Sequence, residues 1–368
     1  DQAAATRILR QALQTQNLPD AAQAQLRQLQ KTVEQGDTNA TQKMHSAQSY
    51  SYSRGSVVLS AVEDQLLEGW LAGDLVPLNS APFMREGPQQ TPELNRMQGM
   101  LGGLVAGAGE DSQATILSLE TLKLVNGSNR FLPWIGSFCK SLAEAPVTRP
   151  WNSHREFQLR VHEGFLACGA RSSDCGAMVR MAPLLLARYK RGGAGFWVFL
   201  IMGSHVTHID AASAACSLAW ASLLWDLACQ PSPPAGQFYW ERFSSVLKQV
   251  QREAVCAARA PRYDGWRGTP YEFFQMVLTE ARANGRSFEE ARDDWSAGPH
   301  ILEATATALY LLESHGHQPQ LAMRLALARE SDREWLGALV GAAVGAVHGQ
   351  WTLSGNAAST WSEFAGRL

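Results

Sequence analysis

The hydrophobic and small residues of this chain repeat at helical spacing, and the clearest case runs from Ser331 to Gly349. Within that stretch glycine recurs at every fourth position, at Gly337, Gly341, Gly345 and Gly349. Residues four apart lie on one face of an α-helix, so these glycines form a stripe. Each glycine inside a helix costs about 1 kcal/mol relative to alanine. The pattern therefore predicts a central helix that packs backbone to backbone against a neighbour.

Two earlier segments, 60–75 and 93–107, carry glycine at the same spacing. The glycines are Gly69 and Gly73 in the first segment and Gly99, Gly103 and Gly107 in the second. Further helices are predicted at 112–124, 183–189, 204–228, 240–258, 269–284, 301–314 and 318–328, and there is no sustained period-two alternation. The apolar piece 195–203 fits either a helix end or a buried strand. We expect an all-α fold with the glycine-bearing helices at its centre.

The first 56 residues differ from the rest of the chain, since they hold eleven glutamines and no tryptophan. Two short helices fit there, but their apolar stripes are too narrow to form a core. We predict a polar helical N-terminal extension and linker at 1–56, which docks on the main domain, docks on a partner or stays partly mobile. The main domain is predicted at 57–368.

Composition narrows the classes of function. The net charge is −2 and the pI is about 6.5, which gives no electrostatic reason to expect nucleic acid or an anionic membrane as a partner. The six cysteines form no CxxC pair, so we expect reduced thiols and a cytoplasmic protein. The longest apolar run, Ala211 to Trp225, is shorter than a membrane span and holds three serines. No transmembrane helix is expected.

Two acidic clusters stand where predicted helices begin. Glu110 and Asp111 follow the second glycine-bearing helix, and Asp332 and Glu334 open the last one. Each cluster could serve only as a helix cap, because carboxylates are favourable at helix N-termini. If the glycine-bearing helices pack together, however, the four carboxylates come close, and Mg²⁺ takes such oxygen ligands. Capping and a metal site both remain open at this stage.

Five short motifs resemble those of one enzyme family, and they occur in that family's order. They are Glu68–Asp74 (EGWLAGD), Gly109–Ser112 (GEDS), Ser173–Pro183 (SDCGAMVRMAP), Thr207–Asp210 (THID) and Asp332–Trp335 (DREW). Over roughly residues 57–350 the chain resembles the ADP-ribosylglycohydrolases, all-helical enzymes that carry two Mg²⁺ ions and cleave ADP-ribose from modified proteins. The resemblance implies a compact orthogonal helical bundle.

The resemblance also implies roles for particular residues. One or two Mg²⁺ ions would lie among the catalytic carboxylates Glu110, Asp111, Asp332 and Glu334. Substrate would contact Glu68, Ser173, Asp174, Cys175, Gly176, His208 and Trp335. Gly109 and Trp335 stand where the family has hydroxyl ligands. This leaves three alternatives, which are a re-tuned site with extra waters, a site for one metal ion, and a protein that binds without catalysis.

Three of the residues have plain structural alternatives. His208 fits a helix cap or a core histidine as well as a substrate contact, and Arg180 fits an ion pair with a carboxylate. Cys175 is a poor candidate nucleophile, because no base partner is identifiable.

Three functions follow as hypotheses. The first is an ADP-ribosyl-acceptor hydrolase acting on ADP-ribosylated protein, with arginine as one candidate acceptor. The second is an immunity protein that neutralises an ADP-ribosyltransferase toxin through residues 1–56. The third is a catalytically inactive ADP-ribose binder.

Overall fold

The computed structural model describes residues 88, 90–126, 139–147, 150–161, 169–189, 195–251, 254–295 and 298–349, with 358–360, 362 and 365 near the C-terminus. All of them lie in the second of the two units, 1–80 and 81–368, into which the chain divides. The predicted extension 1–56, its boundary with the main domain, the predicted helix 60–75 and Glu68 lie outside the described residues.

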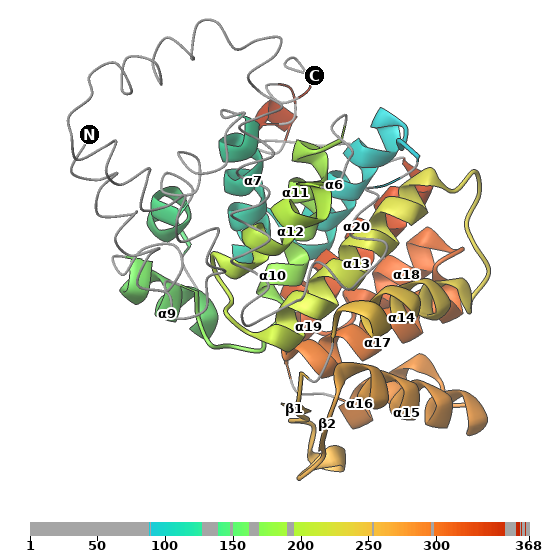
Figure 1. Cartoon of the computed structure of the whole chain (residues 1–368). Coiled ribbons are helices and arrows are strands. Elements are labelled where there is room, and N and C mark those ends of the chain that lie inside the picture. The colour runs from blue at the N-terminus through green and yellow to red at the C-terminus, as the bar shows by residue number, and fades with distance from the viewer. Residues whose placement is uncertain are drawn as a thin grey trace, which may run out of the picture. The chain divides into compact units, whose positions relative to one another are not determined.

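The described residues are overwhelmingly helical, which confirms the all-α class (Figure 1). The helices are α6 (Leu94–Ala108), α7 (Gln113–Asn126), α9 (Asn152–Arg160), α10 (Gly176–Val179), α11 (Met181–Ala187), α12 (Gly195–His205), α13 (Ala211–Cys229), α14 (Phe238–Val250), α15 (Pro270–Ala283), α16 (Phe288–Trp295), α17 (Ile301–His315), α18 (Pro319–Ala326), α19 (Glu330–Asp332), the π-helical turn η3 (Arg333–Gly337) and α20 (Ala338–His348). Strands β1 (Cys256–Ala257) and β2 (Arg267–Gly268) pair antiparallel around the 3₁₀ turn η2 (Pro261–Tyr263).

Helices α6 and α20 pack along their glycine stripes, as the spacing predicts. Gly99 faces Gly345 and Gly349, Gly103 faces Gly341, and Gly107 faces Gly337. A Cβ atom placed on Gly103 would lie only 2.7 Å from the carbonyl carbon of Gly341, a distance that real Cβ atoms essentially never show. The two backbones are therefore in direct contact, which repays the intrinsic cost of glycine in both helices.

The interior of the domain is built around α13, which Asp210 caps by accepting a 2.7 Å hydrogen bond from the Ser213 N–H. In the part of the chain that the structure describes, α13 is the one helix long and apolar enough to cross a membrane. However, 89% of its apolar window is buried inside the fold. We therefore interpret α13 as the core helix of this domain.

Several helix boundaries differ from the prediction. The segment 204–228 is interrupted at 206–210, where α12 ends and the Asp210 cap starts α13. The predicted helix 240–258 is wrong after Val250, because the chain turns there into β1. The ambiguous piece 195–203 is helical and belongs to α12. Helices α9 and α16 were not predicted, since both are short and polar.

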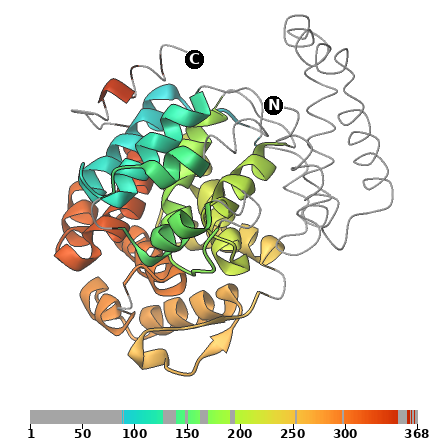
Figure 2. The ribbon, with the colours of Figure 1, turned by 90° about the vertical axis from the view of Figure 1, so that its left-hand side faces the viewer.

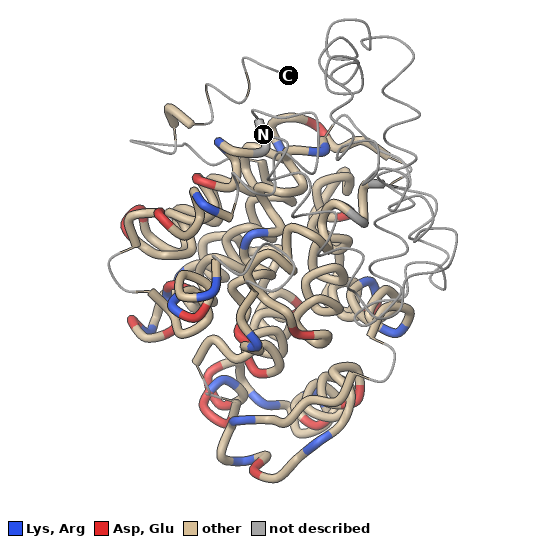
Figure 3. Tube along the Cα trace, turned by 60° about the vertical axis from the view of Figure 1, so that its left-hand side comes forward, with Lys and Arg blue, Asp and Glu red and all other residues tan. Residues whose placement is uncertain are grey.

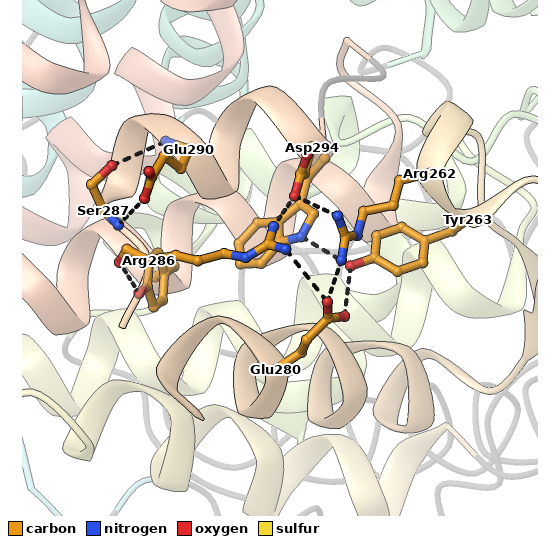
Figure 4. Close-up of polar contacts among 9 residues, drawn as sticks. Arg262, Tyr263, Glu280, Arg286, Ser287, Glu290 and Asp294 are labelled. Atoms are coloured by element: carbon orange, nitrogen blue, oxygen red, sulfur yellow. Dashed lines mark hydrogen bonds and ion pairs between the residues drawn. The ribbon is translucent and has the colours of Figure 1, made fainter. Parts of the chain in front are cut away.

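Helices α15 and α16 and the β1–β2 hairpin form one end of the domain in both ribbon views (Figures 1 and 2). Four charged side chains join them, as Figure 4 shows. Arg262 pairs with Glu280 and, at 2.9 Å, with Asp294, while Arg286 pairs with the same two carboxylates. In Figure 3, charged positions are frequent at this end and sparse along the central helices.

Candidate functional site

The α6–α20 packing brings the segments that carry the two acidic clusters near each other. Helix α6 ends just before Gly109, and Gly107 touches Gly337 at the end of η3. From η3, the Glu334 side chain reaches the start of α7, where its Oε1 atom accepts a 2.6 Å hydrogen bond from the Gln113 backbone N–H. This N–H belongs to the first turn of α7, which has no partner for it within the helix. A carboxylate there also benefits from the helix dipole.

Trp151, which immediately precedes α9, joins this contact. Its indole Nε1–H donates to Glu334 Oε2 at 3.0 Å, and its backbone N–H donates to the Gln113 side-chain oxygen at 2.6 Å. Trp151 is half-buried and Gln113 is buried. Neither residue was predicted from the sequence, because an isolated tryptophan or glutamine carries no motif.

The predicted substrate loop lies against the same indole. A Cβ atom on Gly176 would lie 3.3 Å from Cζ3 of Trp151, 3.0 Å from Asp174 Oδ1 and 3.1 Å from Cε1 of His208. A side chain at 176 would be tightly packed, because these three neighbours would have to shift by a few tenths of an ångström to admit it. Gly176 therefore lies between the Trp151 indole and the side chains of Asp174 and His208.

Short backbone contacts hold the loop in place. The Cys175 N–H donates to the Pro299 carbonyl at 2.8 Å, and the Ile301 N–H donates to the Ser173 carbonyl at 2.6 Å. On the other side, Ala170 pairs with the 207–209 segment through two hydrogen bonds of 2.8 Å. The loop is thus anchored to two segments that lie far from it in sequence.

Asp174 and His208 form a buried pair. His208 Nε2 lies 2.7 Å from Asp174 Oδ1, and His208 Nδ1 lies 2.8 Å from the Thr207 hydroxyl. Burial by itself raises the pKa of Asp174, but the charge and hydrogen bond of His208 and the N–H of Gly176 outweigh it. The pKa of this carboxyl therefore lies well below its usual value. The geometry agrees with a core histidine, while a direct substrate contact stays a prediction.

Arg180 belongs to the same buried network, and among the described residues no carboxylate forms an ion pair with it. It is 2% exposed, and it donates to the Gly176 carbonyl at 3.1 Å and to the Thr207 hydroxyl. Burial lowers the pKa of Arg180 to about 10, against the opposing effect of Asp174. Burial, helped by the charges of Arg180 and His208, lowers the pKa of His154 to about 4. His154 is therefore neutral at pH 7.

Cys175 is fully buried, and its surroundings disfavour a thiolate. Burial, together with the negative charges of Asp174 and Glu334, raises the pKa of Cys175 well above its ordinary value. A thiol held in its protonated form is a weak nucleophile. This agrees with the low expectation for Cys175 as a nucleophile.

The remaining acidic residues are placed differently from one another. Asp332 is 3% exposed and accepts a 3.0 Å hydrogen bond from the Ser331 hydroxyl. Glu110 and Asp111 are exposed on the turn before α7. The cap of α7 is Ser112, whose hydroxyl accepts the Thr115 N–H at 3.1 Å. Ser112 therefore takes the capping role considered for Asp111, and Asp332 precedes η3 without a side-chain capping hydrogen bond.

The pair of Mg²⁺ ions that the resemblance implies has no ready-formed site among the described residues. Among the residues that the structure describes, no three His, Cys, Asp or Glu side chains converge on a point where a metal could bind. Both oxygens of Glu334 already accept N–H donors. The guanidinium of Arg333 would lie 3.9 Å from a Cβ atom on Gly109, where a hydroxyl ligand was expected. The assignment of Glu110, Asp111, Asp332 and Glu334 as metal ligands stays a prediction.

Trp335 occupies the other position where a hydroxyl ligand was expected. It is 5% exposed, and its Nε1 atom has no hydrogen-bond partner within the described ranges. The indole thus packs into the protein beside Asp332 and Glu334. Its predicted contact with substrate stays a prediction.

The fold and this site define an all-α protein whose glycine-packed helix pair presents carboxylates next to an anchored Asp-Cys-Gly loop. The family model of the ADP-ribosylglycohydrolases matches residues 67–354, so the chain belongs to that family. A search of curated proteins finds no match. Family membership supports a hydrolase that acts on ADP-ribose modifications, in a family whose members are generally metal-dependent.

Proposed function

We propose that the chain is an ADP-ribosyl-acceptor hydrolase that binds the ADP-ribosyl group of a modified protein and cleaves its bond to the acceptor side chain. One observation carries the proposal. The Glu334 carboxylate meets the start of α7 and Trp151, and Trp151 in turn lies against the 173–176 loop. Residues from distant parts of the sequence, several of them expected at the substrate site, thereby gather in one place.

The chemistry requires a base, an acid and a water molecule. Asp332 is the best candidate for the base, because it is a buried carboxylate at the turn that also presents Glu334. As a base it would take a proton from water while the water oxygen attacks the anomeric carbon of the ribose. The bond to the acceptor then breaks, and the acceptor atom takes up a proton. Glu110 and Asp111, which are exposed on the turn before α7, are the candidates for the acid that supplies this proton.

A second candidate function is recognition of ADP-ribose without turnover. It is favoured by the commitment of Glu334 to two N–H donors and by Gly109 and Trp335 in place of hydroxyl groups. A chain with this site would hold the ligand but would not cleave it. ADP-ribosylated protein is the partner in both cases.

The immunity hypothesis concerns residues 1–56, which lie outside the described residues. It is tested by deleting the extension. Loss of protection against an ADP-ribosyltransferase toxin with unchanged hydrolysis would support an inhibitory arm. Equal protection by the shortened chain would contradict it.

The test of the proposed function is calorimetric titration of ADP-ribose into the full chain, with Mg²⁺ and again with EDTA. The same titration is made with Asp332→Ala and with the control Glu330→Ala, an exposed acid two residues earlier. Release of ADP-ribose from ADP-ribosylated arginine is then followed for each protein. We expect binding by the wild type and the control, and loss of turnover in Asp332→Ala. Full turnover in Asp332→Ala contradicts the assigned base, and absence of binding in every condition contradicts both candidate functions.

A further inference from the structure

Glu334 stands at a position where the family resemblance implies a metal ligand. In the structure, however, its carboxylate binds N–H groups of the protein. Its two oxygens accept N–H donors from two separate segments, Gln113 at 2.6 Å and Trp151 at 3.0 Å. Charge-assisted hydrogen bonds of this kind are stronger than neutral ones. The donors come from the start of α7 and from the residue before α9, and neither segment is adjacent to η3 in sequence.

The three residues form a closed set of contacts. Besides binding Glu334, Trp151 donates its backbone N–H to the Gln113 side chain at 2.6 Å. Each of the three therefore contacts the other two. The indole cannot shift without breaking a bond to Glu334, and its outer edge lies against Gly176 of the substrate loop.

We infer that Glu334 is a positioning residue, which fixes Trp151 between α7 and the 173–176 loop and does so without a metal ion. The inference deepens the proposed function, because Trp151 then forms a fixed wall of the ADP-ribosyl site. The geometry that supports it is independent of turnover. It holds for an active hydrolase and for a protein that only binds.

A purely metal-binding role for Glu334 leads to a different expectation. In that case the carboxylate would contribute to stability only when the ion is bound, and Trp151 would be a bystander. The two roles separate in EDTA. A positioning carboxylate contributes as much to stability in EDTA as in Mg²⁺, whereas a metal ligand contributes only in Mg²⁺.

The test uses the full chain with Glu334→Gln, Trp151→Phe, the double variant and the control Glu330→Gln. Each protein is unfolded in urea in EDTA and in Mg²⁺, and its tryptophan indole N–H signals are recorded by ¹H–¹⁵N NMR. Trp151→Phe identifies the Trp151 signal by its disappearance. Mg²⁺ affinity is measured by calorimetry with the metal alone.

We expect Glu334→Gln to shift the Trp151 indole signal and to lower the folding equilibrium constant about tenfold in EDTA, the effect of weakening a hydrogen bond to a charged group. The effects of the two substitutions should not add in the double variant, because they remove the same contact. Glu330→Gln should change neither quantity. Any affinity for Mg²⁺ should survive in Glu334→Gln.

The opposite pattern overturns the inference. It consists of an unchanged indole signal and unchanged stability in EDTA, together with loss of Mg²⁺ binding in Glu334→Gln. Additive effects in the double variant would overturn it as well. Failure of the proposed function gives a different result. Glu334→Gln would then still shift the Trp151 indole signal and lower the stability, while ADP-ribose would bind to none of the proteins.

Discussion

Substitution of Gly103 by alanine gives the sharpest test of the α6–α20 packing. In an ordinary exposed helix this change stabilises by about 1 kcal/mol, because alanine is the better helix former. Here the new Cβ atom would lie 2.7 Å from the Gly341 carbonyl carbon and closer still to its oxygen, whereas ordinary contact begins at 3.4 Å. The obstacle is helix backbone, which cannot rotate away as a side chain can.

The magnitude follows from these distances. The helices must separate locally by at least about 0.7 Å, and the same close contact is repeated at Gly99 and Gly107. Overpacking a well-packed interior costs about 1–3 kcal/mol, and a rigid backbone obstacle belongs at or above the upper end. After the gain in helix propensity is subtracted, we expect a net loss of about 2 kcal/mol or more.

The assay is urea unfolding followed by tryptophan fluorescence. The matched control is Ala106→Gly on the exposed face of α6, which should cost about 1 kcal/mol by propensity alone. Destabilisation by both opposite substitutions would show that contact, and not propensity, decides the outcome at Gly103. If Gly103→Ala is as stable as the wild type or more stable, the argument for backbone contact between α6 and α20 is wrong.

Two further predictions concern charge. His154 stays neutral in the folded protein because its pKa is about 4, whereas the unfolded histidine takes up a proton below its ordinary pKa of 6.5. Stability should therefore fall as the pH falls from about 6.5 towards 4, by at most about 1.4 kcal/mol per pH unit from this group. Urea unfolding at several pH values gives the free energy of unfolding as a function of pH. This free energy should fall less steeply with falling pH in His154→Gln than in the wild type, and an identical pH dependence would contradict the low pKa of His154. At the other end of the domain, Arg262→Ala should cost less than about 1 kcal/mol, because its ion pairs are roughly a third exposed. The loss should shrink in high salt, and a large loss that salt does not change would mean that Arg262 acts through packing.

The sequence by itself determined the helical class and the central helix pair. Glycine at every fourth position leaves a backbone face with no side chains, and burying that face against another helix is what compensates for the propensity cost of glycine. Each stripe can be read from a short segment of sequence, and close packing against another helix is the outcome that compensates for it. The pairing of 93–107 with the glycine-rich helix near the C-terminus was therefore predictable. The ordered motifs likewise indicated the family, and the model match over 67–354 confirms it.

Several helix boundaries were not predicted from the periodicity. The Asp210 cap splits an apolar stretch that periodicity alone treats as continuous, and the pairing of β1 with β2 ends the helix expected to run to residue 258. Helix α9 is short and polar, and α16 is also short, with its apolar stripe limited to Phe288, Ala291 and Trp295. Their formation depends on what they pack against.

The tertiary structure alone decided what the acidic residues do. The sequence placed Glu334 correctly at the turn before the glycine-rich helix, but the donors of its hydrogen bonds lie 221 and 183 residues away. Whether a carboxylate binds a metal, caps a helix or holds an indole depends on which groups the fold brings within about 3 Å of it. Local sequence fixes the charge of Glu334, and the packing of α7 and Trp151 against η3 assigns that charge its partners.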